Sequence, residues 1–263
     1  MKASANAIVA TVAVANAALP KAGGTMTGNI ATKGITSVTL GTSNFVAGVN
    51  AGNSITSGGN YNTVVGDEAG TAITTGDRNS AVGMSALVAN TTGSFNAALG
   101  YESLKANTTG GQNTGLGDRT LLANTTGALN TAVGQGSLAA NTTASNNVAV
   151  GVAALEANTT GTENVAVGAS ALTDNTTNGY NTAVGFESLK VNTTGNKNTA
   201  VGRKSLAANT TGIENVAVGY DCLDANTTAS GNTAIGKSAL GANTTGASNT
   251  SVGKSALQLN TTG

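Results

Sequence analysis

Aromatic side chains, charged side chains and proline are scarce in this sequence, and histidine and tryptophan are missing altogether. Of 263 residues, 3% are aromatic, 9% are charged and one is proline. So few aromatic residues argue against an ordinary packed globular core, and so little charge argues against a solvated disordered chain. Low complexity combined with a strict repeat period is instead typical of repeat proteins.

Net charge is missing as well. Twelve Lys and Arg residues balance twelve Asp and Glu residues, so no net field draws the chain to nucleic acid or to an anionic membrane. Without histidine there is no ordinary catalytic triad and no imidazole ligand for a metal. The acidic residues do not form a calcium-binding repeat either. We therefore expect no enzyme, no cofactor, no metal and no nucleic-acid partner.

Cysteine and long hydrophobic runs are rare too. The single cysteine, Cys222, cannot form an internal disulfide. No run of 18 apolar residues is present, so we expect no membrane insertion. The N-terminus contains a lysine, an apolar run over residues 8–14 and the triplet Ala-Asn-Ala at 15–17, which are parts of a secretory signal. Because the run is short and Thr11 interrupts it, another interpretation, given below, is preferred.

What the sequence does have is a repeat of 17 residues. Each copy opens with an asparagine, as in "NTAVG", and twelve copies follow one another without insertion or deletion. A degenerate forerunner begins at Asn44, 18 residues before the first copy. Numbering the positions of the repeat as columns 1 to 17, column 1 is occupied by Asn62, Asn79, Asn96, Asn113, Asn130, Asn147, Asn164, Asn181, Asn198, Asn215, Asn232 and Asn249.

The columns differ sharply in what they tolerate. Column 4 is always branched aliphatic, column 5 is always Gly, column 8 is small, and column 9 is Leu in every copy but one, where it is Gly70. Columns 13 and 14 are always Thr. Columns 6, 7, 10, 16 and 17 vary, and they hold 20 of the 21 charged residues from Asp67 onward. Because charge is costly to bury, the variable columns are expected to face water, and the fixed columns to face inward or form turns.

This pattern predicts an all-β fold, a β-solenoid of twelve 17-residue coils. Seventeen residues are too few for a helical hairpin, and Gly in every coil opposes a helix. We expect two short strands per coil, one around column 4 and one around column 9, with columns 9 and 11 on one face and column 10 on the other. Gly at column 5 marks a corner. Asn at columns 1 and 12 suits the left-handed backbone conformation and can hydrogen-bond to its copy in the next coil.

Two segments carry a resemblance to a known family. Residues 18–30, "ALPKAGGTMTGNI", resemble the junction common in bacteriophage tail fibres, and the "NTAVG…SL…NTTG" units resemble repeats of phage and bacterial fibre proteins and the head repeats of trimeric autotransporter adhesins. The resemblance implies a parallel homotrimer in a virion tail fibre, assembled in the host cytoplasm with other tail proteins and acting in host attachment. The adhesin repeat is usually shorter, so the turn bearing "NTT" is an elaboration.

The resemblance also bears on the N-terminus. Ile8, Val12, Ala15 and Leu19 are spaced like a heptad fragment, which favours a short parallel coiled coil over a signal peptide. The expected domains are a helical stem at 1–19, a junction segment at 20–43 and the β-solenoid shaft at 44–263.

The aromatic residues from Tyr61 onward occupy two outward columns. They are Tyr61, Phe95 and Tyr180 in column 17, and Tyr101, Phe186 and Tyr220 in column 6. They either pack between subunits or stack on sugars of a host cell-surface partner, and packing is the preferred interpretation. The host partner is a glycan or a protein.

Five alternatives remain to be weighed. Glycan cleavage needs paired carboxylates in a cleft, and Asp67/Glu68 and Asp221/Asp224 are pairs, but an uninterrupted period leaves no inserted loop to build a cleft. Ice binding by threonine rows is disfavoured, because adjacent threonines in a strand point to opposite faces. A bacterial adhesin-type surface protein is a further alternative. The "NTT" triplets are also N-glycosylation sequons. Cys222, a column-8 residue, is interpreted as a small apolar filler rather than a nucleophile.

Overall fold

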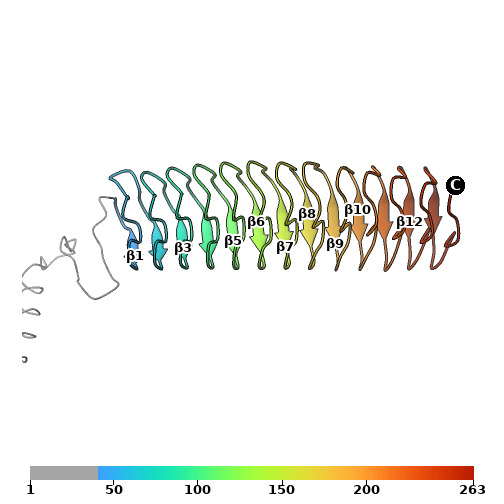
Figure 1. Ribbon diagram of the computed structural model, residues 1–263, viewed down its shortest axis with the longest axis horizontal. Coiled ribbons are helices and arrows are strands. Elements are labelled where there is room, and N and C mark those ends of the chain that lie inside the picture. Colours follow the sequence, from blue (N-terminus) through green and yellow to red (C-terminus); the bar gives the residue numbers. More distant parts are fainter. Residues whose placement is uncertain (1–40) are drawn as a thin grey trace, which may run out of the picture.

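A computed structural model describes residues 41–263 and shows a single straight stack of coils (Figure 1). Every regular element in this range is a three-residue strand, and the strands form one 13-stranded sheet in sequence order. The stem expected at 1–19 and nearly all of the junction segment lie outside the described residues. The strands are β1 (Phe45–Ala47), β2 (Thr63–Val65), β3 (Ser80–Val82), β4 (Ala97–Leu99), β5 (Thr114–Leu116), β6 (Thr131–Val133), β7 (Val148–Val150), β8 (Val165–Val167), β9 (Thr182–Val184), β10 (Thr199–Val201), β11 (Val216–Val218), β12 (Thr233–Ile235) and β13 (Thr250–Val252).

All neighbouring strands are parallel, and equal columns pair with equal columns. Between β6 and β7, for example, Thr131 pairs with Val148 and Val133 with Val150. The forerunner forms a coil of its own, since β1 pairs with β2 across 18 residues, with Phe45 opposite Thr63. The predicted β-solenoid is confirmed, and thirteen strands at the usual spacing give a rod about 58 Å long.

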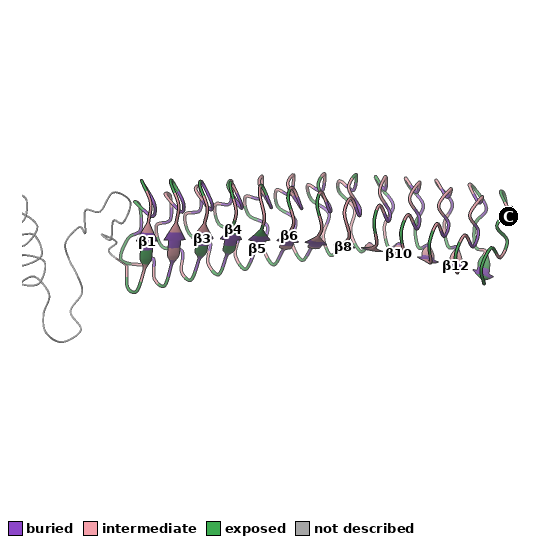
Figure 2. Ribbon diagram, turned by 90° about the horizontal axis from the view of Figure 1, so that it is seen from below, coloured by how far each residue is buried: buried purple, intermediate pink, exposed green. Residues whose placement is uncertain are grey.

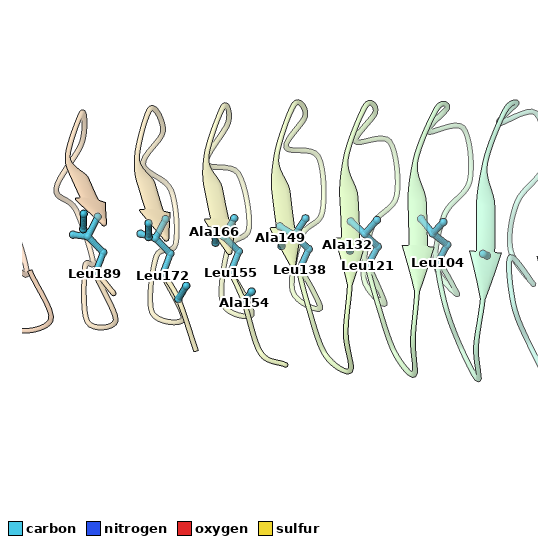
Figure 3. Close-up of a cluster of buried hydrophobic side chains, with 14 of the residues drawn as sticks. Leu104, Leu121, Ala132, Leu138, Ala149, Ala154, Leu155, Ala166, Leu172 and Leu189 are labelled. Atoms are coloured by element: carbon cyan, nitrogen blue, oxygen red, sulfur yellow. The ribbon is translucent and has the colours of Figure 1, made fainter. Parts of the chain in front are cut away.

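The core is a thin column of small and aliphatic side chains. Ala132 at column 3, Ser137 at column 8 and Leu138 at column 9 are all fully buried. Leu138 stacks between the equally buried Leu121 and Leu155 of the adjacent coils, as expected (Figure 3). Burial coloured along the ribbon repeats from coil to coil, so each coil buries the same columns (Figure 2).

The prediction of a second strand around column 9 of each coil is wrong. Leu138 has a φ of 51°, in the left-handed region, and the backbone around it forms turns rather than a strand. Columns 8 and 9 are both buried, whereas Ala140 at column 11 is half-exposed, so the expected alternation of columns 9, 10 and 11 is also wrong. The coil still bonds to its neighbour here, because the Leu138 N–H donates to the Ala154 carbonyl at 3.0 Å.

The expectation that the fixed columns face inward or form turns is wrong for column 4, which faces outward. Each strand spans columns 2 to 4, and the middle residue is the buried one. Alternation along a strand therefore turns columns 2 and 4 to the outer face of the sheet. A column can thus be invariably aliphatic and still be exposed.

The asparagine columns stack as predicted but not in the predicted backbone conformation. The Asn130 side-chain amide donates to the Ala144 carbonyl at 2.8 Å, and its Oδ1 accepts from the Asn147 N–H at 3.0 Å. In column 12, Asn141 donates to Asn124 Oδ1 at 2.8 Å. The residues with positive φ lie in columns 5, 7, 9 and 17 instead, because the turns fall there and the asparagines serve as hydrogen-bonding spacers.

The corner expected at column 5 is confirmed. Gly134 has a φ of 115°, and a Cβ at this position would lie 2.7 Å from the Gly151 carbonyl oxygen of the next coil. Close approach of two backbones therefore excludes any side chain.

The exception in column 9 is explained by a compensating exchange. Where Gly70 replaces leucine, Ile73 takes the place of the column-12 asparagine and Val64 that of the column-3 alanine, and both are fully buried. The forerunner uses the same combination, with Val46, Gly52 and Ile55. The core volume is thus conserved while its residues change position.

Candidate functional site

A continuous aliphatic row runs along the outer face of the sheet in column 4. Its members range from half-buried to well exposed, and Leu99, Leu116 and Ile235 expose 49%, 43% and 42% of their surface. Columns 2 and 4 hold no charged residue in any of the twelve repeats. The aliphatic row consists of Val65, Val82, Leu99, Leu116, Val133, Val150, Val167, Val184, Val201, Val218, Ile235 and Val252.

The column-17 aromatics lie on the surface, and two of them share a cation. The Arg78 guanidinium carbon lies 5.5 Å from the centre of the Tyr61 ring and 5.2 Å from that of Phe95. These three residues come from consecutive coils, so the cation stands between the two rings. Tyr180, the third aromatic residue of this column, is 57% exposed, and within residues 41–263 it belongs to no such group.

The column-6 aromatics also contact cations. Arg119 lies 5.6 Å from the Tyr101 ring. Farther along, Arg203 lies 5.8 Å from the centre of the Phe186 ring and 5.2 Å from that of the Tyr220 ring, and the Lys237 ammonium lies 5.5 Å from the centre of the Tyr220 ring. Cation–ring contacts at these distances are attractive.

The structure thus places all six predicted aromatics outward, and five of them lie in separate cation–ring clusters along the rod. The cations Arg78, Arg119, Arg203 and Lys237 were missed by the sequence analysis. A signal for three of them was present, because Arg78, Arg203 and Lys237 occupy the same column as an aromatic residue one repeat away.

Ion pairs connect columns 7 and 10 and neighbouring coils. Glu102 contacts Lys105 at 2.6 Å and Arg119 at 3.2 Å, and Glu187 contacts Lys190 at 2.7 Å and Lys204 at 3.7 Å. The hydrogen bond from Lys105 holds the pKa of Glu102 below its ordinary value. The cations of these pairs are exposed and the glutamates are half-buried, so the pairs favour the in-register stacking of coils but add little stability.

The acidic pairs are placed differently. Asp67 and Glu68 are exposed on the first repeat. Asp221 and Asp224 line a shallow cavity of about 310 Å³, together with Ser238, Gly241 and Gln258. Burial, and next the nearby Asp221 charge, raise the pKa of Asp224. Within residues 41–263, no three His, Cys, Asp or Glu side chains gather closely enough to hold a metal ion.

Comparison with protein-family models, curated proteins and solved structures found no match. No helix in the described part of the chain is long and apolar enough to cross a membrane.

The lone cysteine is sealed in the core. Cys222 is fully buried, its thiol donates to the Ala234 carbonyl at 3.2 Å, and burial raises its pKa to about 11. A thiolate is the nucleophilic form, so this environment suits a packing residue.

The "NTT" triplets form three kinds of row. The sequon asparagine is buried, as with Asn124, whose amide donates to Asn107 Oδ1 at 2.7 Å and to the Gly127 carbonyl at 3.0 Å. The folded coil therefore hides this nitrogen from a glycosyltransferase. The Thr125 hydroxyl donates to the Thr142 carbonyl of the next coil at 3.0 Å. Thr126 is exposed, and its hydroxyl has no protein partner within the described residues.

Proposed function

We propose that this chain is the rigid shaft of a phage tail fibre, built from three parallel copies and acting in host attachment. The resemblance of residues 18–30 and of the repeats to fibre proteins supports this, as does an uninterrupted rod of identical coils. The shaft holds the receptor-binding apparatus away from the particle and assembles with other tail proteins in the host cytoplasm.

The aliphatic row is the observation that carries the proposal. It follows the whole rod, it contains no charge in any repeat, and its neighbours in column 2 are Thr, Val, Ser or Ala. Soluble monomers rarely leave so long an apolar surface open to water. Three parallel chains that turn this face toward a common axis bring identical residues of equal coils together, and no charge is buried in doing so.

The variable columns support a spacer role. Columns 6, 7, 10, 16 and 17 change from coil to coil, so no surface function is repeated along the length. A regular backbone with a changing surface is expected where the shape itself is what matters.

The molar mass in solution tests this proposal. Light scattering at micromolar concentration should give three times the chain mass of 25.3 kDa. Leu116→Asp, in the aliphatic row, should lower the mass toward that of one chain because it places a charge in the interface. Ala139→Asp, in variable column 10, should leave the mass unchanged. A monomeric parent protein contradicts the proposal.

A second candidate function, ice binding, is favoured by the column-14 threonines. Adjacent threonines face opposite ways only in a strand, and columns 13 and 14 lie outside the strands. Column 14 instead forms an exposed row of threonines along all twelve repeats. Only one row has free hydroxyls, and a single row matches a crystal face poorly. An ice-recrystallisation assay of the parent protein and of Thr126→Lys distinguishes the two candidates.

A further inference from the structure

One stretch of column 6 differs from the rest of the surface by its alternating chemistry. In five consecutive coils it reads Phe186, Arg203, Tyr220, Lys237 and Lys254. The first four are in contact in that order, with cation-to-ring distances of 5.8, 5.2 and 5.5 Å. We call these five residues the ring–cation ladder. At the usual strand spacing it spans about 19 Å.

We infer that the ring–cation ladder binds an acidic polysaccharide. Phe186 and Tyr220 expose 47% and 44% of their surface, so each ring presents apolar surface beside its cations to the C–H side of a sugar. The rings are two coils apart, which is about 9.6 Å at the usual strand spacing, a distance comparable to the length of a disaccharide. Alternate sugars of an extended chain can therefore meet successive rings.

The cations of the ladder are available to carboxylates. Arg203 donates to the Tyr220 hydroxyl at 2.8 Å and forms an ion pair with Asp221 at 3.7 Å. Because a guanidinium has five N–H donors, others remain for a ligand. Within the described residues, Lys237 contacts the Tyr220 ring and forms no ion pair. A row of guanidinium and ammonium groups beside two rings suits a chain that carries both sugar faces and negative charge.

The mixed charge of the surrounding surface favours a polysaccharide over single-stranded nucleic acid. Glu187, Asp221 and Asp224 lie in columns 7 and 10 of the same coils. A nucleic-acid site needs a continuous basic groove, which these acids interrupt and which the neutral chain does not provide. The ladder offers a single row of cations, which suits carboxylates along one side of a polyuronate chain.

The inference adds a binding function to the proposed shaft and does not depend on the trimer. A subunit-packing role for the same aromatics is its main competitor. A variant of Tyr101 distinguishes subunit packing from polysaccharide binding, because Tyr101 occupies the same column and would share any subunit contact made by column 6. The cation beside Tyr101, Arg119, is paired with Glu102 at 3.2 Å, and the next column-6 residue is Asp118, so Tyr101 should not contribute to anion binding.

Titration calorimetry with the full chain tests the inference, with oligogalacturonate, uncharged malto-oligosaccharide and oligothymidylate as probes. Oligogalacturonate should bind, and the other two should bind at least about tenfold more weakly. Tyr220→Ser and Lys237→Gln should each weaken oligogalacturonate binding about tenfold, while Tyr101→Ser should not.

Molar mass and thermal melting of each variant accompany the titration. Weaker binding by a variant whose molar mass and melting temperature equal those of the parent supports the inference. This holds whether the parent is a trimer or a monomer, so the test is independent of the shaft proposal. Absent oligogalacturonate binding, equal binding of the uncharged probe, tighter oligothymidylate binding, or equal effects of Tyr101→Ser and Tyr220→Ser would each overturn it. Lys237→Gln removes only an exposed charge, so it keeps the test meaningful if Tyr220→Ser destabilises the coil.

Discussion

At the scale of single residues, left-handed backbone conformations in non-glycine residues are the unusual feature of this chain. Columns 7, 9 and 17 adopt a φ near +50° to +60° in nearly every coil, as in Leu121, Leu138 and Ala153. Such a conformation costs about 1 kcal/mol or more for a residue with a side chain. Hydrogen bonds to the adjacent coils offset this cost, since the Ala153 N–H donates to the Gln135 carbonyl at 3.0 Å.

Two neighbouring glycines should therefore respond very differently to a methyl group. Gly134→Ala places a Cβ 2.7 Å from the Gly151 carbonyl oxygen and should cost several kcal/mol. Gly136 has a φ of 69° and open space around it, and its column holds Ala153 in the next coil. Gly136→Ala should therefore change stability by no more than about 1 kcal/mol. Denaturant unfolding measures both, and equal losses would mean that the corner does not depend on backbone contact.

Column 9 and column 10 make a second matched pair. Leu138→Asp buries an unpaired charge in a fully closed stack and should cost several kcal/mol. Ala139 lies in the column that holds Lys105 and Glu156 in other coils, so Ala139→Asp should cost less than about 0.5 kcal/mol. Thermal melts compare the two variants. Equal melting temperatures would show that the inward and outward columns are wrongly assigned.

At the scale of the element, the asparagine columns do what a second strand would otherwise do. Each column-1 side chain joins its own coil to the neighbouring one, through a carbonyl such as that of Ala144 and a backbone N–H such as that of Asn147. The side-chain amide needs both its donor and its acceptor for this role.

An aspartate in this column should make stability depend on pH. In Asn130→Asp, one carboxylate oxygen faces the Ala144 carbonyl and Asn113 Oδ1 with no proton to donate, so the folded-state pKa is raised above the unfolded value of about 3.9. The ionisation penalty is then complete above the raised folded pKa and disappears as the pH falls below the unfolded pKa. Asn146→Asp, exposed in column 17, is the control and should show no comparable change. Melting temperatures measured from about pH 3 to about pH 7 follow this change in stability. A loss of stability in Asn130→Asp that does not depend on pH would exclude this mechanism.

The sequence allowed the solenoid, its period and the burial of Leu138 to be predicted, because charge was confined to five columns. It did not reveal that column 4 faces outward. Invariance shows that a residue is constrained, and Val133 is constrained on the outer face just as Leu138 is in the core. The turn at column 9 was missed because leucine rarely adopts a positive φ. The outward position of the aromatic columns was predicted correctly, and their role stays a prediction. Cations such as Arg203 were missed because each side chain was considered apart from its neighbour one coil away.

At the scale of the whole molecule, register is the property that every coil shares. Each strand pairs only with the strands before and after it, so stability is approximately a sum over coils and their interfaces. The 18-residue forerunner shows that an extra residue can be accommodated in a coil.

Removing whole coils should therefore be tolerated, while removing part of one should not. Deletion of residues 130–146 joins Leu129 to Asn147 and keeps every column in place, so the shorter rod should melt cooperatively close to the parent temperature. Deletion of 129–146 also removes a column-17 residue, whose N–H donates to the Gly111 carbonyl at 3.1 Å, and leaves a coil too short to close. Its melt should shift to lower temperature or split in two. Indistinguishable melts for the two deletions would contradict a register-based account.

Because successive strands are hydrogen-bonded side by side along the rod, a pulling force on its two ends acts along those bonds (Figure 1). The bonds that join one coil to the next then carry the load, and a coil opens once the bonds to its neighbour have broken. Each coil that opens releases 17 residues of slack, about 50 Å more than the rise it occupied. The rod is therefore stiff under small forces and lengthens roughly tenfold, in equal steps, under large ones. Under a sudden load, coils would open and the chain would lengthen before any attachment at its ends had to break.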